Sequence, residues 1–461
     1  MMIANKIRSL SPSTKIALSF LVIIFIGSLL LSMPVSNLPT SNVDYFDHLF
    51  TSVSMVCVTG LLTTPIVATY SLFGKIICII LMQVGGLGLM TILAAFIVGV
   101  GRKMTFRDTI AVNEALNRHK VGDFRNYLTS IIKYTAIIEG TAFILLAFRF
   151  VPKFGLGEGM FHALFLAVSG FSNAGFDTMG TNSLQNYVHD PLVNGVMIGL
   201  IILGGIGFSV WFDVTKNVQS IVKRSVKTNL VKNYKRLQVH SRLALNISAI
   251  LLVLSTIVFL AVEWNNPNSI GTFDVGEKLL AAGFQAATFR TAGFTTINFM
   301  DFNNFSIFFF LLISFIGGSP GGTAGGLKTT TVALVILLMY NEIKGQKYVN
   351  YAYHTIPSET VRRALVVVIT FFLCFMLGTS FLLIFEQNQA PFHLMFETAS
   401  ALTTIGLTIN LTPKLSTASQ AIIMILMFIG RIGPITIFLS LGRRSKNQKN
   451  HKYAKTNILI G

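Results

Sequence analysis

Hydrophobic runs without a single charged residue alternate with short polar stretches along the chain. Six of these runs are long enough to cross a bilayer as a helix, which takes about 20 residues. They cover residues 16–43, 76–101, 191–212, 243–262, 302–327 and 364–385. Two further apolar stretches contain charges: residues 126–151 hold Lys133, Glu139 and Arg149, and residues 415–441 hold Arg431. The pattern predicts an all-α, polytopic membrane protein.

Moderately apolar stretches of about ten residues, too short to cross a bilayer, lie between these runs. Each is followed by a segment centred on a glycine. The four segments read FTSVSMVCVTGLLTT (50–64), FLAVSGFSNAGFDTMG (165–180), GFQAATFRTAGFTTIN (283–298) and FETASALTTIGLTIN (396–410). Their aligned glycines, Gly60, Gly175, Gly293 and Gly406, are 115, 118 and 113 residues apart. This near-constant spacing indicates four copies of one unit.

Each copy has the order long run, short stretch, glycine segment, long run. If both long runs cross the membrane, the part between them leaves and re-enters from one face, as a re-entrant pore helix followed by a filter loop. Irregular backbone at this depth is tolerated only where protein buries it or where it lines a wet cavity, so we expect the four loops to surround one central pore. The predicted copies are residues 14–103, 124–216, 240–340 and 362–442, followed by a basic cytosolic tail at 443–461.

The four loops offer backbone carbonyl groups, which in a ring coordinate a dehydrated alkali cation without a fixed countercharge. Glycine accepts the positive φ that points neighbouring carbonyls in one direction. A pore helix that runs inward adds the negative end of its dipole below the loops, and outer acids such as Asp177 raise the local concentration of cations. The candidate ligands of the ion are Val56, Cys57, Val58, Thr59, Gly60, Phe171, Ser172, Asn173, Ala174, Gly175, Phe289, Arg290, Thr291, Ala292, Gly293, Leu402, Thr403, Thr404, Ile405 and Gly406.

The second long run of each copy contains a matched glycine motif, 24 to 29 residues after the filter glycine. The motifs are QVGGLG (83–88), ILGGIG (202–207), FIGGSP (315–320) and FIGRIG (428–433). In the first two copies we interpret these glycines as sites of close helix packing, for which small residues are suited in membranes.

The third copy extends this motif to IGGSPGGTAGGLKTTT (316–331). Its lysine stands one place too late for the phosphate-binding template G-x-x-x-x-G-K-[ST], and the run before it is a membrane span, so a nucleotide site is disfavoured. The stretch also repeats small residues every four positions, as packed helices do. However, its six glycines, at about 1 kcal/mol each, and a proline at about 3 kcal/mol make an unbroken helix unfavourable.

We therefore predict a broken span whose loop, residues 317–328, is a movable gate beneath the filter. The candidate gate residues are Gly317, Gly318, Ser319, Pro320, Gly321, Gly322, Thr323, Ala324, Gly325, Gly326, Lys328 and Arg431.

The composition agrees with a membrane protein: 52% of the 461 residues are hydrophobic, 12% are charged, and the mean hydropathy is +0.67. The net charge of +18 would suggest nucleic acid in a soluble protein. With a cytosolic N-terminus, however, 27 of the 36 Lys and Arg residues fall on the cytosolic side. The positive-inside rule accounts for this distribution, so both termini are predicted to be cytoplasmic and no nucleic-acid partner is expected. The basic loop at 216–242 is also a candidate contact for anionic membrane lipid or for a regulatory subunit.

Other classes of protein find little support. An embedded enzyme would need clustered acids, histidines or a nucleophile within the spans, but Glu139 is isolated and the eight histidines lack metal spacing. Cys57, Cys78 and Cys374 show neither a paired nor a metal-binding pattern. A receptor or scaffold would not require four re-entrant segments. The basic N-terminus precedes a long apolar run without a small-residue cleavage motif, so we expect a retained first span and not a signal peptide.

The four copies of span, pore helix and span, with one filter glycine each, resemble the Trk/Ktr/HKT superfamily of potassium transporters. The size, the short termini and the glycine-rich third copy are similar to the membrane subunits of bacterial Ktr systems, over about residues 14–442. One position departs from the pattern: Gly283 stands where the other copies have Phe50, Phe165 and Phe396, and Phe284 follows one place later. This departure concerns the packing of the third pore helix.

The resemblance implies that glycine at all four filter positions selects potassium. It also implies a homodimer in the bacterial plasma membrane and a cytosolic ring of RCK-type regulatory subunits that bind nucleotide. Uptake in this superfamily is often stimulated by sodium, and no cofactor is expected in this chain. A sodium-permeable or proton-coupled cation transporter is the alternative.

Two arginines near the predicted pathway have more than one interpretation. A charge at Arg290, inside the third filter segment, would repel the ion, so we expect its side chain to point outward and to pair with an acid such as Glu277 or Glu397. Arg431 replaces the second glycine of the fourth motif, and we expect it to face the conduction path as an electrostatic barrier. A buried ion pair or a clamp on backbone carbonyls is the alternative for Arg431.

Overall fold

The computed structural model describes residues 11–88, 91, 124–180, 182–224, 230–434 and 436–437. The tail predicted at 443–461, the first ten residues and most of the loop at 101–125 lie outside the described residues. So do the last residues of the first and fourth predicted copies.

The described part of the chain is built of helices, with a single short hairpin of two antiparallel strands. The α-helices are α2 (Pro12–Leu31), α3 (Tyr45–Cys57), α4 (Ile66–Thr69), α5 (Leu72–Leu87), α8 (Phe124–Phe154), α9 (Leu156–Ser172), α10 (Pro191–Gly205), α11 (Phe208–Arg224), α12 (Leu230–Arg236), α13 (Val239–Glu263), α14 (Val275–Thr288), α15 (Asn304–Ser314), α16 (Thr329–Ile343), α17 (Ser358–Phe385), α18 (Pro391–Thr403) and α19 (Thr417–Ile432). The 3₁₀ turns are η1 (Pro34–Ser36), η2 (Gln185–Tyr187), η3 (Phe299–Asp301) and η4 (Thr412–Lys414), and the hairpin pairs β1 (Asn350–Tyr351) with β2 (His354–Thr355).

Helix starts follow local capping rules. At α10, Pro191 occupies the first turn, where its missing N–H has no partner to lose. The Asp190 carboxylate accepts from the N–H groups of Leu192 and Val193, at 3.1 and 3.2 Å. Ser11, Ser71 and Ser416 cap α2, α5 and α19 with their hydroxyl oxygens in the same way.

Four helices within the described residues, α2, α8, α13 and α17, are long and apolar enough to cross a membrane. The run at 191–212, which is predicted to cross the membrane, is divided between α10 and α11, and these two helices meet at an angle of 98°. Helices α5, α15, α16 and α19 are apolar but shorter. The predicted all-α membrane fold is therefore confirmed, and the run at 191–212 contains a bend that the sequence pattern did not predict.

Glycines with positive φ end three of these helices. Gly88 follows α5, Gly207 lies at the bend after α10 and Gly433 follows α19, with φ of 78°, 96° and 93°. A residue in this conformation cannot continue a right-handed helix. These glycines thus end helices as well as pack them: α5 ends at Leu87 and α19 at Ile432. Most of the remainder of the runs at 76–101 and 415–441 lies outside the described residues.

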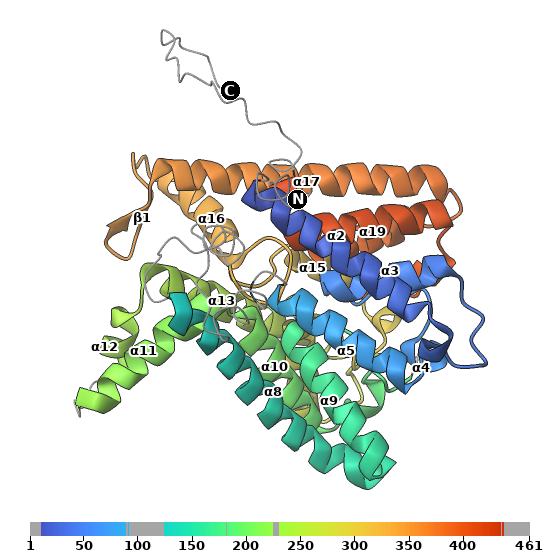
Figure 1. Cartoon of the computed structure of the whole chain (residues 1–461). Coiled ribbons are helices and arrows are strands. Elements are labelled where there is room, and N and C mark those ends of the chain that lie inside the picture. The colour runs from blue at the N-terminus through green and yellow to red at the C-terminus, as the bar shows by residue number, and fades with distance from the viewer. Residues whose placement is uncertain are drawn as a thin grey trace, which may run out of the picture.

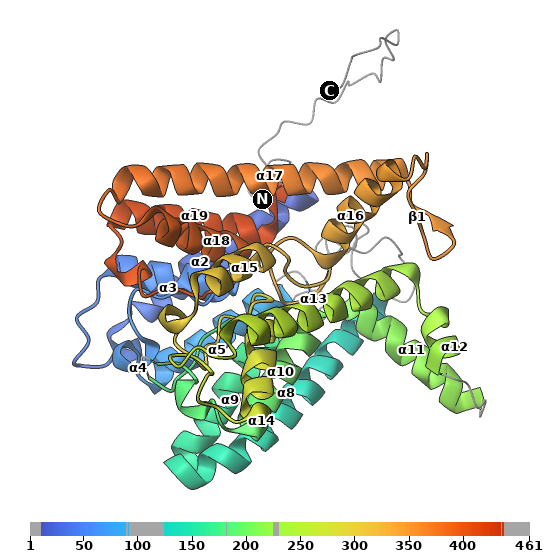
Figure 2. The ribbon, with the colours of Figure 1, turned by 180° about the vertical axis from the view of Figure 1, so that it is seen from behind.

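The helices form one body with α17 beside α19 at one edge and α8 beside α9 at the opposite edge (Figures 1 and 2). Large apolar side chains are exposed on the outward faces of the long helices, as lipid contact requires. Examples are Leu21, Phe25, Phe148, Ile257, Phe372 and Leu377. The filter segments lie between these edges, inside the buried core.

Candidate ion filter and gate

Four short helices, α3, α9, α14 and α18, each lead into one of the glycine segments. The residue two places before each filter glycine has a left-handed backbone: φ is 55° at Val58, 55° at Asn173, 66° at Thr291 and 54° at Thr404. The filter glycines themselves have φ of 105°, 74°, 80° and 83°. Positive φ is uncommon outside glycine, so its recurrence at the same place in all four segments indicates one shared chain path.

The four filter glycines meet around a single axis. A methyl group on Gly60 would lie 3.0 Å from the carbonyl oxygen of Ala174 and 3.2 Å from the Cα of Gly406. A methyl group on Gly175 would lie 2.8 Å from the carbonyl oxygen of Ala292 and 3.0 Å from the Cα of Gly293.

The other two glycines close the ring. A methyl group on Gly293 would collide with the carbonyl oxygen of Ile405, and one on Gly406 with that of Thr59. Each glycine thus faces the carbonyl of the residue that precedes the glycine of the next segment. The order 60, 175, 293, 406 runs once around the axis, and only glycine leaves room for these approaches.

The facing carbonyl groups have no donor among the described residues. They belong to Thr59, Ala174, Ala292 and Ile405, which are at most 1% exposed. No hydrogen bond to these four oxygens is found in the described part of the chain. Buried carbonyl groups are almost always paired, so a ring of unpaired oxygens has the chemistry of a cation site.

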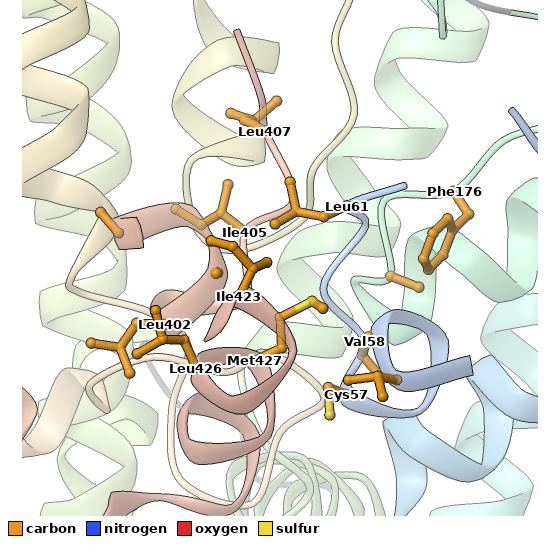
Figure 3. Close-up of a cluster of buried hydrophobic side chains, with 14 of the residues drawn as sticks. Cys57, Val58, Leu61, Phe176, Leu402, Ile405, Leu407, Ile423, Leu426 and Met427 are labelled. Atoms are coloured by element: carbon orange, nitrogen blue, oxygen red, sulfur yellow. The ribbon is translucent and has the colours of Figure 1, made fainter. Parts of the chain in front are cut away.

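Apolar side chains of the segments lie in hydrophobic packing. Figure 3 shows Val58 and Ile405 in a cluster with Ile423, Leu426 and Met427 of α19. All five side chains are buried, at 4% exposure or less. The packing leaves the backbone of the segments, and not their side chains, to form the ring.

Glycines of the second helices touch the pore helices at one repeated position. A methyl group on Gly85, Gly204 or Gly430 would collide with the carbonyl of Val56, Phe171 or Leu402, respectively. Each of these three partners stands four places before its filter glycine. In the third copy Gly317 instead faces the carbonyl of Gly325, in the same loop. Close packing by these glycines was predicted for the first two copies, and the contact also occurs in the fourth.

The third pore helix ends differently from the other three. Helix α14 ends at Thr288, five places before its filter glycine, whereas the others end three places before theirs. In the other copies the carbonyl of a serine, Ser54, Ser169 or Ser400, accepts the N–H that precedes the filter glycine, at 2.8 to 3.0 Å. In the third copy the carbonyl of Thr288 accepts from Ala292 N–H at 2.9 Å, and the Thr288 hydroxyl donates to Phe294.

Phe284 in the third pore helix is fully buried despite its one-residue offset. The earlier end of α14 accompanies this offset in register. The difference therefore changes the pore helix and its cap, while Gly293 keeps its place in the ring.

Arg290 pairs with no acid among the described residues. Its guanidinium donates to the hydroxyl of Ser248 on α13, at 2.9 Å, and the side chain is 3% exposed. Glu277 lies 2.8 Å from His189 instead, and Glu397 accepts from Thr408 and Thr412. The prediction that Arg290 pairs with Glu277 or Glu397 was wrong, because both acids have other partners and Arg290 donates to Ser248.

The loop of the third copy is closed at its base. Ile316 and Leu327 form a parallel bridge. In this bridge Gly317 N–H donates to the carbonyl of Leu327 at 2.9 Å, and Leu327 N–H donates to the carbonyl of Phe315 at 3.1 Å. Thr329 N–H donates to Gly318 at 3.0 Å. The predicted break in the span is present, and its two ends are joined by backbone hydrogen bonds.

The loop is docked on the broken end of α10. The N–H groups of Ser319 and Thr323 donate to the carbonyls of Gly205 and Gly204, at 2.8 and 3.1 Å. In the opposite direction, Phe208 N–H donates to the carbonyl of Gly321 at 3.0 Å. A helix that stops leaves its last carbonyls without partners. The loop amides supply those partners, so the break after α10 and the loop of the third copy complete each other.

Thr323 joins the loop to the second filter segment. Its hydroxyl donates to the carbonyl of Phe171 at 2.9 Å and accepts from the side-chain amide of Asn173 at 2.8 Å. Thr323 and Asn173 are fully buried. The carbonyl of Phe171, a candidate ion ligand from the sequence, is thus engaged by the loop. A methyl group on Gly325 would likewise collide with the side chain of Thr404 in the fourth segment.

Arg431 holds the loop from the other side. Its guanidinium donates to the carbonyls of Gly85 and Gly86 at 2.5 and 2.9 Å, and also to the carbonyl of Thr323. Lys328 donates to the carbonyl of Ala324 at 2.7 Å. Of the interpretations offered for Arg431, the structure therefore has the carbonyl clamp, which joins the end of α5 to the loop. The sequence could not reveal this contact, because the partners lie 108 and about 346 places away.

Fold and site together define a helical membrane protein in which four glycine segments converge on one axis. The model of the family described as "TrkH: Cation transport protein" matches residues 4–453. The chain belongs to this family, which is one of cation transporters and not of enzymes.

Curated relatives match the chain along nearly its whole length. It is 35% identical over 452 residues to the "Ktr system potassium uptake protein B" of Bacillus subtilis, covering 98% of this chain and 97% of that protein. The protein of the same description from Vibrio alginolyticus is 33% identical, with 97% and 94% covered. The "Potassium/sodium uptake protein NtpJ" of Enterococcus hirae is also 33% identical, with 98% of each chain covered.

A solved structure has a similar fold. The crystal structure of the potassium transporter TrkH from Vibrio parahaemolyticus matches with a TM-score of 0.67, 19% identity, and coverage of 92% of this chain and 84% of that one.

Proposed function

We propose that this protein takes up potassium through a pore on the axis where the four filter segments meet. The observation that carries the proposal is the ring of four glycines, each beside an unpaired buried carbonyl of the next segment. Carbonyl oxygens replace the hydration shell of a potassium ion without binding it irreversibly. The left-handed residues before each glycine hold these carbonyls in place, so little backbone reorganisation accompanies ion entry.

Potassium, among the alkali cations, is favoured by two further points. Relatives that match nearly the full chain carry potassium uptake in their descriptions. Glycine also occupies all four filter positions, which in the superfamily that the sequence resembles goes with potassium selectivity.

The loop at residues 317–328 is proposed as the gate, with Lys328 at its lower edge and Arg431 as its clamp. Six hydrogen bonds dock it: three with the backbone around the end of α10, two through the Thr323 hydroxyl and one from Arg431. At about 0.5 to 1.5 kcal/mol net each, these bonds hold the loop by several kcal/mol. A partner needs about 5.5 kcal/mol of differential binding to change a closed-to-open ratio from 99:1 to 1:99, so release of the loop is within reach of a regulatory subunit.

The expected assembly follows the resemblance. It is a homodimer in the bacterial plasma membrane, with both termini cytoplasmic, seated on a cytosolic RCK-type ring that binds nucleotide. The descriptions "Ktr system" of two relatives support a system of several components. The basic region at 216–242 is the proposed contact with this ring or with anionic lipid, and sodium is the proposed stimulating ion.

A second candidate function is transport of sodium together with potassium. The observation that favours it is the 33% identity to a protein described as a potassium/sodium uptake protein. The two candidates differ in whether sodium competes at the filter.

The test is uptake of rubidium-86 by proteoliposomes, repeated as growth of potassium-uptake-deficient bacteria at low potassium. Potassium is expected to compete with rubidium at least about tenfold better than sodium, a difference of about 1.4 kcal/mol. The Gly60→Ser variant should lose that preference, because its side chain would meet Ala174 and Gly406. Gly199→Ser on α10 is the control, since space beside Gly199 is open. Equal competition by sodium in the wild type would favour the second candidate.

A further inference from the structure

A cavity of about 450 Å³ lies away from the filter, at the C-terminal end of α8. Its walls come from α8, η2 and the start of α10. The lining residues are Arg149, Pro152, Lys153, Asn186, Tyr187, His189 and Asp190. None of them belongs to the filter segments or to the loop at 317–328, so the proposed transport function leaves this cavity unexplained.

The cavity has more basic than acidic capacity. Both oxygens of Asp190 are engaged: one pairs with Nε of Arg149, and the other accepts from the N–H groups of Leu192 and Val193. His189 lies 2.8 Å from Glu277. Within the described part of the chain Arg149 pairs through Nε alone, and its side chain is 60% exposed. The guanidinium therefore keeps its terminal N–H groups for a ligand.

Lys153 is the second cation of the cavity. Its ammonium lies 4.5 Å from the ring centre of Tyr187 and 5.5 Å from that of Phe154. No ion pair of Lys153 is found within the described part of the chain. The Tyr187 hydroxyl is also buried without a hydrogen-bond partner among the described residues. Two cations one helical turn apart have the donors that an oxyanion needs.

The cavity adjoins a surface that faces lipid. Ile137, Ile144 and Phe148 are exposed on α8 before the cavity begins, by 53%, 55% and 72% of their surface. They are spaced by seven and four residues, which puts them on one helix face. Arg149 and Lys153 follow within the last two turns, where long cationic side chains reach the headgroup layer.

We infer that this cavity binds the phosphate headgroup of an anionic phospholipid, whose acyl chains lie along the exposed face of α8. The volume is in the range of small-ligand sites. Arg149 and Lys153 donate to the phosphate oxygens, and guanidinium groups suit phosphate geometry. In the orientation of the proposed function, α8 starts on the cytosolic side, so the lipid belongs to the outer leaflet. The outer leaflet is also the side where the positive-inside rule leaves few cations.

Native mass spectrometry of the delipidated full-length protein tests the inference, with phosphatidylglycerol as the probe. Arg149→Gln/Lys153→Gln should bind it at least tenfold more weakly than wild type, and Lys153→Gln alone about threefold more weakly. Lys153→Gln breaks no ion pair found in the described part of the chain, so it is informative even if loss of Arg149 disturbs folding. Lys414→Gln is the matched control, because Lys414 is an exposed lysine of the same predicted face, outside this cavity.

Three results would overturn the inference. In the first, both variants keep wild-type affinity. In the second, phosphatidylcholine binds the wild-type protein as tightly as phosphatidylglycerol does. In the third, soluble glycerol 3-phosphate displaces the lipid at equal concentration, which would assign the cavity to a free phosphate ester. Because transport is not the readout, failure here leaves the filter proposal untouched.

Discussion

The filter and the layer directly beneath it use the same four copies in opposite ways. In the filter, every copy has a left-handed residue two places before a glycine of positive φ, and every glycine faces a carbonyl of its neighbour. Beneath the filter, α5, α10 and α19 end at single glycines, whereas the third copy has the loop at 317–328. Coordination of one ion on an axis calls for equal ligands from all sides, while control needs only one movable part.

The same asymmetry affects how the copies are supported. In three copies a glycine of the second helix packs on the pore-helix carbonyl four places before the filter glycine, but Gly317 packs on its own loop. The third pore helix also ends earlier, and the buried Arg290 follows it in the filter segment. The third copy is therefore less tied to its own filter segment, and its loop at 317–328 is held through Arg431 and Thr323 to the first and second copies.

The largest effect is expected from removing the loop. Deletion of residues 318–325 takes away the amides that dock on Gly204 and Gly205 and the carbonyl that Arg431 clamps. Rubidium flux in proteoliposomes should rise about tenfold or more, corresponding to loss of about 1.4 kcal/mol or more of closed-state stabilisation. Selectivity for potassium over sodium should stay, because the filter ring is not altered.

A matched change in another copy sharpens this result. Gly88→Ala strains the end of α5, where φ is 78°, but its methyl group would meet no atom of the loop at 317–328. Its effect on flux should be smaller than that of the deletion. Unchanged or slower flux in the deletion variant, with the protein still folded by size-exclusion chromatography, would refute the gate.

A moderate effect is expected from Thr323→Val, which keeps the shape of the side chain and removes its hydroxyl. The carbonyl of Phe171 then loses its donor, and the side-chain amide of Asn173 loses its acceptor. Leaving buried polar groups unpaired costs about 1 to 3 kcal/mol, and we expect flux to rise about threefold to tenfold.

The control for Thr323→Val is Thr370→Val, because the Thr370 hydroxyl bonds only within α17 and faces outward. If both variants behaved alike in rubidium flux, the link between loop and filter would have no role in gating.

The smallest effect is expected from Ser248→Ala, which removes the hydroxyl partner of Arg290. A hydrogen bond to a charged group contributes about 1.5 to 3 kcal/mol, so the melting temperature should fall by a few degrees. Half-saturation for rubidium should change less than about twofold, since the guanidinium points toward α13 and not toward the axis. A large change in ion affinity with an unchanged melting temperature would contradict this structural role.

The sequence by itself determined what depends on local pattern. Apolar runs of membrane length indicate the spans, and the spacing of Gly60, Gly175, Gly293 and Gly406 points to equivalent backbone positions whose positive φ only glycine adopts readily. The cost of glycines and a proline in a helix was enough to predict the break at residues 316–328, because that cost is a property of the residues themselves.

Only the tertiary structure decided what depends on partners far along the chain. A single Gly207 is compatible with a straight helix until the loop of the third copy supplies donors to the carbonyls of Gly204 and Gly205. The sequence likewise left Arg431 between a barrier and a clamp, and it suggested acids for Arg290 that the structure engages elsewhere. A buried cation takes whichever oxygen the fold brings within reach, and no local pattern along the chain records that choice.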